Sequence, residues 1–170
     1  MGITIGDSLA VVALLVGIGL SLWALLVAIA LLFPERARAS EVALTASAWR
    51  PLLLGAMVLI SVGTFSLVLA GMANPGAKLF GTIGLLVLLA HASIGATGMA
   101  RLIGERITRL DPGCSAYRAQ VRGTGFLVVA GFLPFLGWFA FTPLILCASL
   151  GAGILAMGRR YSLAAPPVIE

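Results

Sequence analysis

Charged residues are scarce in this chain: Asp, Glu, Lys and Arg together make up only 10% of its 170 residues. A soluble domain carries roughly 25% charged residues, so the composition argues against an ordinary soluble protein. Hydrophobic residues make up 61% of the chain, and the mean hydropathy is +1.13. The sequence therefore predicts an integral membrane protein.

Residues that usually carry chemistry are also rare. Cys114 and Cys147 show neither CxxC spacing nor a neighbouring histidine, so no disulfide or metal site is indicated. No acidic residue lies within an apolar run, and a membrane proton relay normally needs one. The chain offers no nucleophile with a base and no phosphate-binding glycine loop. We therefore expect a protein that is not an enzyme.

The only histidine, His91, sits near the middle of an apolar run. An ionisable residue at membrane depth is a functional hypothesis by default, here as a pigment or haem ligand or as a proton relay. One copy of the chain cannot supply two histidines to a haem. The alternative is a neutral imidazole that hydrogen-bonds a neighbouring helix. Apart from His91, no cofactor is indicated.

Long apolar runs fill most of the chain, and three of them, at 9–33, 52–73 and 79–100, reach the ~20 residues that a spanning helix needs. The first run is too long for a signal peptide, and residues 1–7 contain no Lys or Arg. We expect an all-α helical bundle in one membrane domain, with helices at about 8–33, 51–73, 79–110, 115–133 and 138–158. This is three spanning helices plus a C-terminal helical hairpin, or four to five membrane segments, with 34–50 as a connecting loop.

The closing stretch, residues 124–158, contains 35 residues without a formal charge, ~52 Å if it is helical throughout. That length fits neither one straight crossing nor two full ones. Pro134 and Gly137 predict a reversal, because proline interrupts the helical ladder and glycine accepts unusual dihedrals. Trp138 and neighbouring phenylalanines suit a membrane interface. Three layouts stay open: a full hairpin, which is favoured, a re-entrant hairpin, and one kinked crossing.

Basic residues fall on one side of the predicted layout if the closing stretch returns. That arrangement places Lys78 alone against ten arginines. By the positive-inside rule, it puts the N-terminus outside and the C-terminus in the cytoplasm of a bacterial inner membrane. We expect these arginines to set orientation and to contact lipid headgroups, and we expect no nucleic acid as partner: Arg36, Arg38, Arg50, Arg101, Arg106, Arg109, Arg118, Arg122, Arg159 and Arg160.

The third predicted helix continues past its apolar run into "RLIGERITRL", with Ile103, Ile107 and Leu110 on one face. Glu105 stands four residues from both Arg101 and Arg109, which predicts ion pairs along the helix surface.

Small residues recur at helical spacing. Ala92, Ala96 and Ala100 repeat every four residues in the third predicted helix, and Gly17 and Ser21 do so in the first. Such patches let membrane helices approach closely. Two interpretations are open: packing within the chain, or a docking face for a partner chain.

Four segments carry a resemblance to a known family: "LLFPERAR", "WRPLLLGA", "GMARLIGERI" and "FLPFLGWFAFTPLILCASLGAGILA", in that order. Over residues 25–160 the chain resembles the multi-helix membrane domain attached to, or accompanying, bactofilin-type polymer-forming cytoskeletal proteins of bacteria. The matching positions are Phe33, Pro34, Pro51, Gly55, Gly104 and the turn at 134–138. The resemblance implies an all-α membrane fold and anchoring or scaffold work. The chain departs from the family in having no β-helical polymerising domain.

Together these patterns favour a non-catalytic membrane scaffold or accessory subunit, with the lipid bilayer and other membrane protein subunits as partners. A first alternative is a small transporter or lipid-binding membrane protein that uses a polar cavity around His91, Thr64 and Ser66. A second alternative is a cofactor- or pigment-associated subunit of an energy-converting complex, with His91 as ligand.

Overall fold

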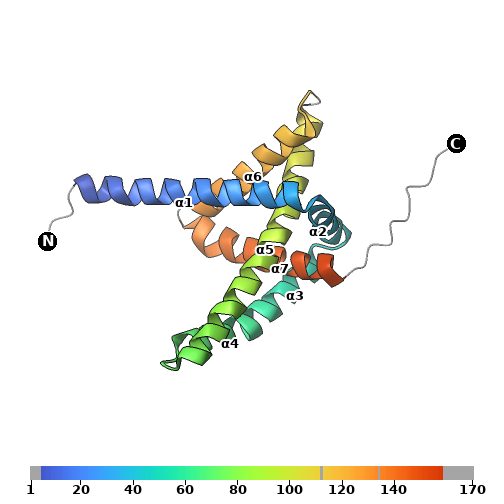
Figure 1. The fold of residues 1–170 in the computed structure, drawn as a ribbon. Helices are drawn as coiled ribbons and strands as arrows, with labels where there is room; N and C mark the ends of the chain where they lie inside the picture. The colour runs from blue at the N-terminus through green and yellow to red at the C-terminus, as the bar shows by residue number, and fades with distance from the viewer. Residues whose placement is uncertain (1–4, 112, 134, 159–170) are drawn as a thin grey trace.

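The computed structural model describes residues 5–111, 113–133 and 135–158, and all regular structure in those ranges is helical. Figure 1 shows the arrangement of the elements. In chain order they are α1 (Ile5–Leu32), α2 (Pro34–Ala46), α3 (Trp49–Val58), η1 (Leu59–Gly63), α4 (Thr64–Gly71), α5 (Pro75–Leu110), α6 (Ala116–Phe132), η2 (Gly137–Phe141) and α7 (Thr142–Gly158). The π-helical turns η1 and η2 continue directly into α4 and α7.

Within the described residues, four helices are long and apolar enough to cross a membrane: Leu9–Leu32, Trp49–Gly71, Pro75–Leu110 and Gly137–Gly158. The expected all-helical membrane bundle is therefore confirmed. After α6 the chain reverses, and α7 leads back toward the side from which α6 came (Figure 1). The two arms on either side of this turn diverge instead of packing along each other, and only the second, Gly137–Gly158, is among the four candidate spans, so the choice among the three membrane layouts stays a prediction.

Helix ends follow from local chemistry. The side chain of Asn74 caps α5 by accepting a hydrogen bond from the Gly76 amide at 2.9 Å, and Pro75 occupies the first helical turn. Ser115 caps α6 in the same manner, accepting from the Arg118 amide at 3.4 Å. The first turn of α6 therefore lies close to the predicted start at residue 115.

The reversal between α6 and α7 differs from the prediction in its dihedrals. Pro134 lies outside the described residues. Phe135 has φ 62°, whereas no glycine in the described residues has a positive φ. The prediction that Gly137 supplies the unusual dihedral is wrong. Gly137 is instead needed for close approach, because a Cβ there would lie 2.7 Å from the Ala130 carbonyl oxygen.

Helix α2 was missed, because residues 34–50 were expected to form a loop. Pro34 occupies its first turn, where the missing N–H costs nothing. Its buried side includes Ala37, Ser40 and Ala43, so hydropathy does not mark it. These short side chains let α2 lie directly against α5 and α7. Burial of small residues, not an apolar stripe, holds this helix in place.

Helix α5 is the axis of the bundle and runs diagonally through the whole molecule in Figure 1. Helix α4 lies beside its N-terminal part, α6 beside its C-terminal part, and α7 crosses its middle. The largest buried cluster joins Leu26 and Leu127 to Ala96 and Ala100. Large apolar side chains mostly point outward, as for Met57, 71% exposed. The protein therefore has small residues inside and large apolar residues outside, which suits a lipid environment.

Candidate functional site

His91 does not assemble a site with other ligating residues. Its Nδ1 lies 2.7 Å from the Val87 carbonyl oxygen of its own helix, so the ring is hydrogen-bonded locally. The residue as a whole is half-buried. The expected bond to a neighbouring helix is not what the structure has. Among the described residues, no group of three or more His, Cys, Asp or Glu side chains could hold a metal ion. Ser93 and Thr97 likewise bond to backbone carbonyls of α5.

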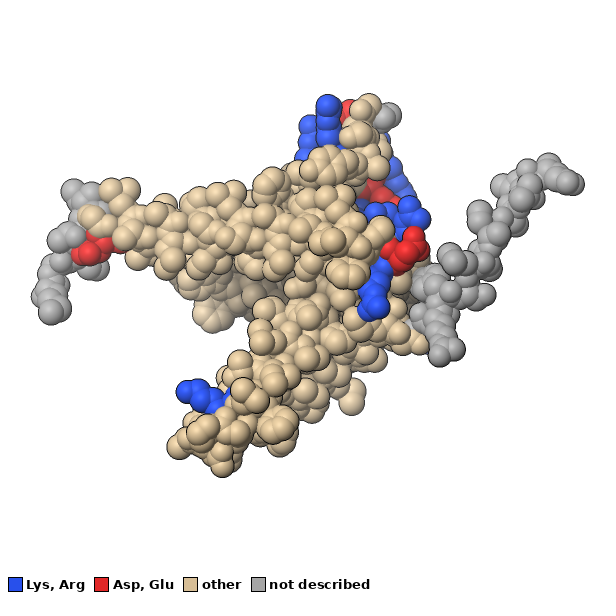
Figure 2. Space-filling view, in the orientation of Figure 1, with Lys and Arg blue, Asp and Glu red and all other residues tan. Residues whose placement is uncertain are grey.

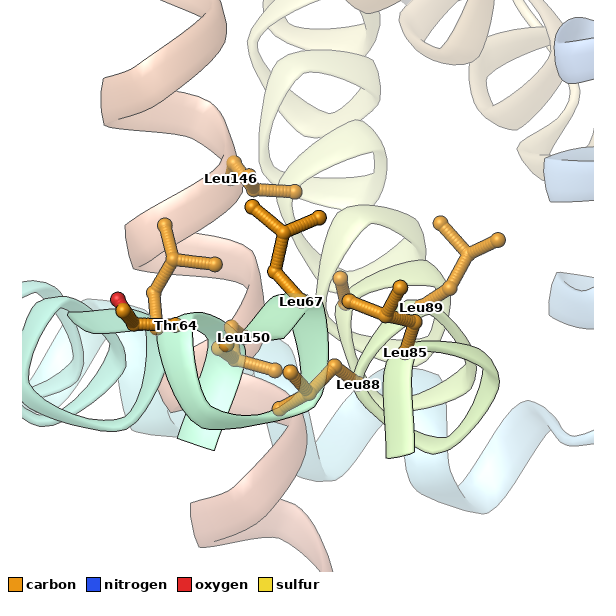
Figure 3. Close-up of a pocket in the computed structure, with 10 residues that line it drawn as sticks. Thr64, Leu67, Leu85, Leu88, Leu89, Leu146 and Leu150 are labelled. Atoms are coloured by element: carbon orange, nitrogen blue, oxygen red, sulfur yellow. The ribbon is translucent and has the colours of Figure 1, made fainter. Parts of the chain in front are cut away.

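A groove of about 370 Å³ lies where η1 and α4 face α5 and α7 (Figure 3). Its lining is almost entirely leucine, and Thr64 contributes the only hydroxyl. Ser66 is buried elsewhere, against Gly84 on the α4–α5 contact. His91 is not part of the lining. The three residues that a polar transport cavity would need are therefore not brought together.

The helices cross at glycines, and most of these positions were not singled out from the sequence. A Cβ on Gly55 of α3 would overlap the Cys147 carbonyl oxygen of α7, and a Cβ on Gly151 would overlap the Pro51 carbonyl oxygen. At the α5–α7 crossing, a Cβ on Gly95 would overlap the Ser149 carbonyl oxygen. The available signal was the abundance of glycine, with 21 in the chain. It does not say which glycines meet.

The alanine set of the third predicted helix is used inside the chain. Ala92, Ala96 and Ala100 are all buried on α5, and the last of them is fully inaccessible. Next to them, a Cβ on Gly123 of α6 would overlap the Ala100 carbonyl oxygen. For these residues the interpretation as packing within the chain fits the structure.

Charged side chains gather along one side of the molecule, over α2 and around the connection between α5 and α6 (Figure 2). The rest of the visible surface carries only small charged patches, near the start of α1 and near the α4–α5 turn. Arg122 of α6 lies 3.5 Å from Asp111 within this charged side. Arg159 and Arg160 lie outside the described residues.

One ion pair links α2 to α5. Arg101 donates from Nε to the Glu41 carboxylate at 2.7 Å, and the Glu41 side chain is only 10% exposed. Arg101 therefore pairs with Glu41, not with Glu105 as expected. The ion pair between Arg101 and Glu41 joins α2 to α5.

Helix α1 has two different faces. One face packs on the bundle: Leu26 and Ala30 are buried, and Trp23 donates from Nε1 to the Val121 carbonyl oxygen of α6 at 3.1 Å. The opposite face carries the predicted pair Gly17 and Ser21, and neither is packed within the chain. Both are exposed, and a Cβ on Gly17 would meet nothing within 4 Å.

The outward face of α1 is a continuous stripe of small residues, of which the sequence analysis noted only two. The stripe has spacings of three and four residues, all of its members are exposed, and we call it the α1 seam: Ala10, Ala13, Gly17, Ser21, Ala24 and Ala28. It is ~27 Å long at 1.5 Å per residue, close to the ~30 Å hydrocarbon thickness. Ser21 donates its hydroxyl to the Gly17 carbonyl at 2.8 Å, so the seam presents no unpaired hydroxyl.

The seam is unlike the outward faces of neighbouring spans. Along Trp49–Gly71 the exposed positions include Leu53, Met57, Ile60 and Phe65, all large. The first half of α5 exposes Phe80, Ile83 and Leu86. On α1, three seam residues, Ala13, Gly17 and Ser21, lie in a shallow groove of about 510 Å³ whose lining comes from this helix alone, and large exposed residues such as Leu14 and Ile18 flank them. Small residues on α1 are thus placed where the chain itself does not use them.

Comparisons with protein-family models, with curated proteins and with solved structures find no match to this chain. The resemblance to the membrane domain of bactofilin-type proteins therefore remains a prediction.

Proposed function

We propose that this protein is a non-catalytic membrane scaffold or accessory subunit, and that the α1 seam holds a transmembrane helix of another chain. The observation that carries the proposal is the seam itself, exposed over the full thickness of a bilayer. Membrane helices associate through small residues at four-residue spacing, because their backbones can then approach closely. A spacing of three and four residues is also the repeat along which two helices stay in contact over several turns.

The rest of the molecule supports a passive role. The interior is assembled from glycine crossings, as at Gly55 and Gly95, where helix backbones touch. The groove at Thr64 is lined by leucines, and His91 bonds to its own helix. Neither of these two features favours the transporter or cofactor-binding alternatives over the scaffold.

Orientation and location belong to the same proposal. The charged side over α2 and the α5–α6 connection (Figure 2) faces the cytoplasm of a bacterial inner membrane, in keeping with the positive-inside rule. The resemblance to the membrane domain that accompanies bactofilin-type polymers adds a class of partner: a larger assembly anchored at that membrane.

The test uses two exposed glycines that both have open space around an added Cβ. Gly17 lies on the seam, Gly71 lies at the end of α4, and a Cβ at either position would meet nothing within 4 Å. A photo-reactive amino acid replaces Ala24, and native membranes are irradiated with wild-type, Gly17→Leu or Gly71→Leu chains. We expect one defined membrane protein to be cross-linked, with the adduct lost in Gly17→Leu and retained in Gly71→Leu.

Three results would count against the proposal. The first is an adduct that Gly17→Leu leaves unchanged. The second is a lone protomer in mild detergent, with only lipid cross-linked. The third is a cross-link to a second copy of this chain, which would assign the seam to self-association. Because a Cβ at either position would meet nothing within 4 Å, we expect both variants to fold, and equal thermal unfolding of the two purified proteins checks this.

A further inference from the structure

A third groove lies beyond the C-terminal end of α1, between the first turns of α2 and the last turn of α7. It holds about 450 Å³ and has charged and apolar parts. Its charged lining is Glu35, Arg36 and Arg38 of α2. Its apolar lining is Ala39 and Val42 of α2 with Ala156 and Met157 of α7. Its lining therefore offers both charged groups and apolar surface to a ligand.

The depth of this groove follows from the helices that end beside it. The apolar span of α1 ends at Leu32, and the span that contains α7 ends at Gly158. The next span begins at Trp49, whose exposed indole suits the headgroup level. The groove lies between the start of α2, which directly follows the α1 span, and the end of α7, so we place it at the membrane surface, where lipid headgroups are.

The two arginines of the groove have no partner in the part of the chain that the structure describes. Neither Arg36 nor Arg38 has a carboxylate within ion-pair distance there. Glu41, on the same helix, is already held by Arg101 at 2.7 Å. Guanidinium groups bind phosphate through paired, charge-assisted hydrogen bonds, and basic pockets between membrane helices bind phospholipid headgroups.

Glu35 decides which headgroup fits. Two cations and one carboxylate in one groove match a phosphodiester that carries a cationic amine on a short arm. We propose that this groove binds phosphatidylethanolamine, with its phosphate on Arg36 and Arg38 and its ammonium on Glu35. The exposed apolar side chains of Val42 and Met157 receive the start of the acyl chains.

Other common headgroups satisfy the groove less well. Phosphatidylglycerol brings the phosphate but no cation for Glu35. Phosphatidylcholine brings a cation whose methyl groups cannot donate hydrogen bonds to the carboxylate. The charges of the groove therefore favour a headgroup with a primary amine over both.

Native mass spectrometry of the full chain in mild detergent tests this. The protein is offered an equimolar mixture of phosphatidylethanolamine, phosphatidylglycerol and phosphatidylcholine with identical acyl chains. We expect a single-lipid adduct dominated by phosphatidylethanolamine. Arg36→Gln with Arg38→Gln should weaken that adduct about tenfold. The control is Arg106→Gln with Arg118→Gln, which removes two exposed arginines that share the general attraction to headgroups but lie outside the groove, and it should weaken the adduct far less.

Glu35→Gln separates headgroup choice from general attraction to phosphate. It should remove the preference for phosphatidylethanolamine over phosphatidylglycerol while both lipids still bind. Equal binding of all three lipids to the wild type, or a preference for phosphatidylglycerol, would overturn the proposal. So would an equal loss of adduct in the two double variants, because the arginines would then act only as surface charge. Displacement of the adduct by inorganic phosphate at low concentration would mean that the groove recognises a free anion.

Discussion

Replacing Gly55 with alanine adds one methyl group at the point where α3 crosses α7. An ideal Cβ there would overlap the Cys147 carbonyl oxygen, and it would lie only 2.7 Å from the Cys147 carbonyl carbon and 2.8 Å from the Gly151 amide nitrogen. These are backbone atoms of a helix, so no rotamer change can clear them. The two helices must move apart along the whole contact.

The size of the effect can be worked from this geometry. Overpacking a dense contact costs about 1–3 kcal/mol, and a clash with backbone belongs at the upper end of that range. Alanine in place of glycine within a helix returns about 1 kcal/mol through backbone entropy. We expect Gly55→Ala to lower the free energy of unfolding by about 2 kcal/mol. Gly17→Ala, where the methyl group meets nothing within 4 Å, should raise it by about 0.5–1 kcal/mol.

The assay is unfolding in mixed micelles as the mole fraction of a denaturing detergent rises, followed by tryptophan fluorescence. The two variants carry the same chemical change, so effects on the micelle or on the unfolded chain cancel between them. If Gly55→Ala is as stable as the wild type, α3 and α7 do not touch at this glycine. If Gly17→Ala is destabilised to the same degree, the outward face of α1 is packed, and the α1 seam is not free.

Two further predictions concern the charged side. Arg101→Gln should destabilise the fold by about 1–3 kcal/mol, because it leaves the buried Glu41 carboxylate without its partner, and adding Glu41→Gln should restore part of that loss. A double-mutant cycle on unfolding free energies measures the coupling between the two residues. Additive effects of the two substitutions would mean that the ion pair does not stabilise the fold. In a cysteine-free background, Lys78→Cys should react with a membrane-impermeant maleimide in intact cells, whereas Arg109→Cys and Arg160→Cys should react only after lysis. Labelling of Arg109→Cys and Arg160→Cys in opposite compartments would contradict the predicted orientation.

Much of the fold could be predicted because long apolar runs leave few alternatives. The third predicted helix begins at residue 79, four residues after the first residue of α5, and the local signals that set the observed start are the Asn74 cap and Pro75 in the first turn. Asp111 lies just after the last residue of α5, as the Asp-Pro-Gly sequence indicates. These signals are local. They depend on residues that act on their own backbone, so one sequence is enough to recognise them.

Helix α2 and the backbone dihedrals of the α6–α7 turn could not be predicted because they depend on contacts between distant segments. Nothing local says that Ser40 lies against Gly98, or that Glu41 finds Arg101 sixty residues later. The positive φ of Phe135 is equally hidden, because a bulky residue rarely adopts it and the surrounding structure must impose it. Hydropathy indicates whether a helix lies in lipid or in water, but it does not indicate which other helix packs against it.

Only two residues of the α1 seam could be predicted from the sequence, for a related reason. Gly17 and Ser21 stand out by their spacing, yet the same spacing occurs at Ala92 and Ala96, which are buried in the bundle. Sequence periodicity cannot separate a small-residue patch that the chain covers from one that it leaves open. The structure separates them, because it gives each face its neighbours.

That separation is what carries the functional argument. A glycine within a helix is less stable than an alanine by about 1 kcal/mol, and at Gly55 or Gly95 this cost is offset by close contact between helices. At Gly17 no contact within the chain offsets it. The bundle cannot turn α1 around to bury the seam, because the opposite face is already fixed by Leu26 and by the Trp23 hydrogen bond. Within the described residues no other helix covers the α1 seam, so its small residues are left open on the outward face of α1.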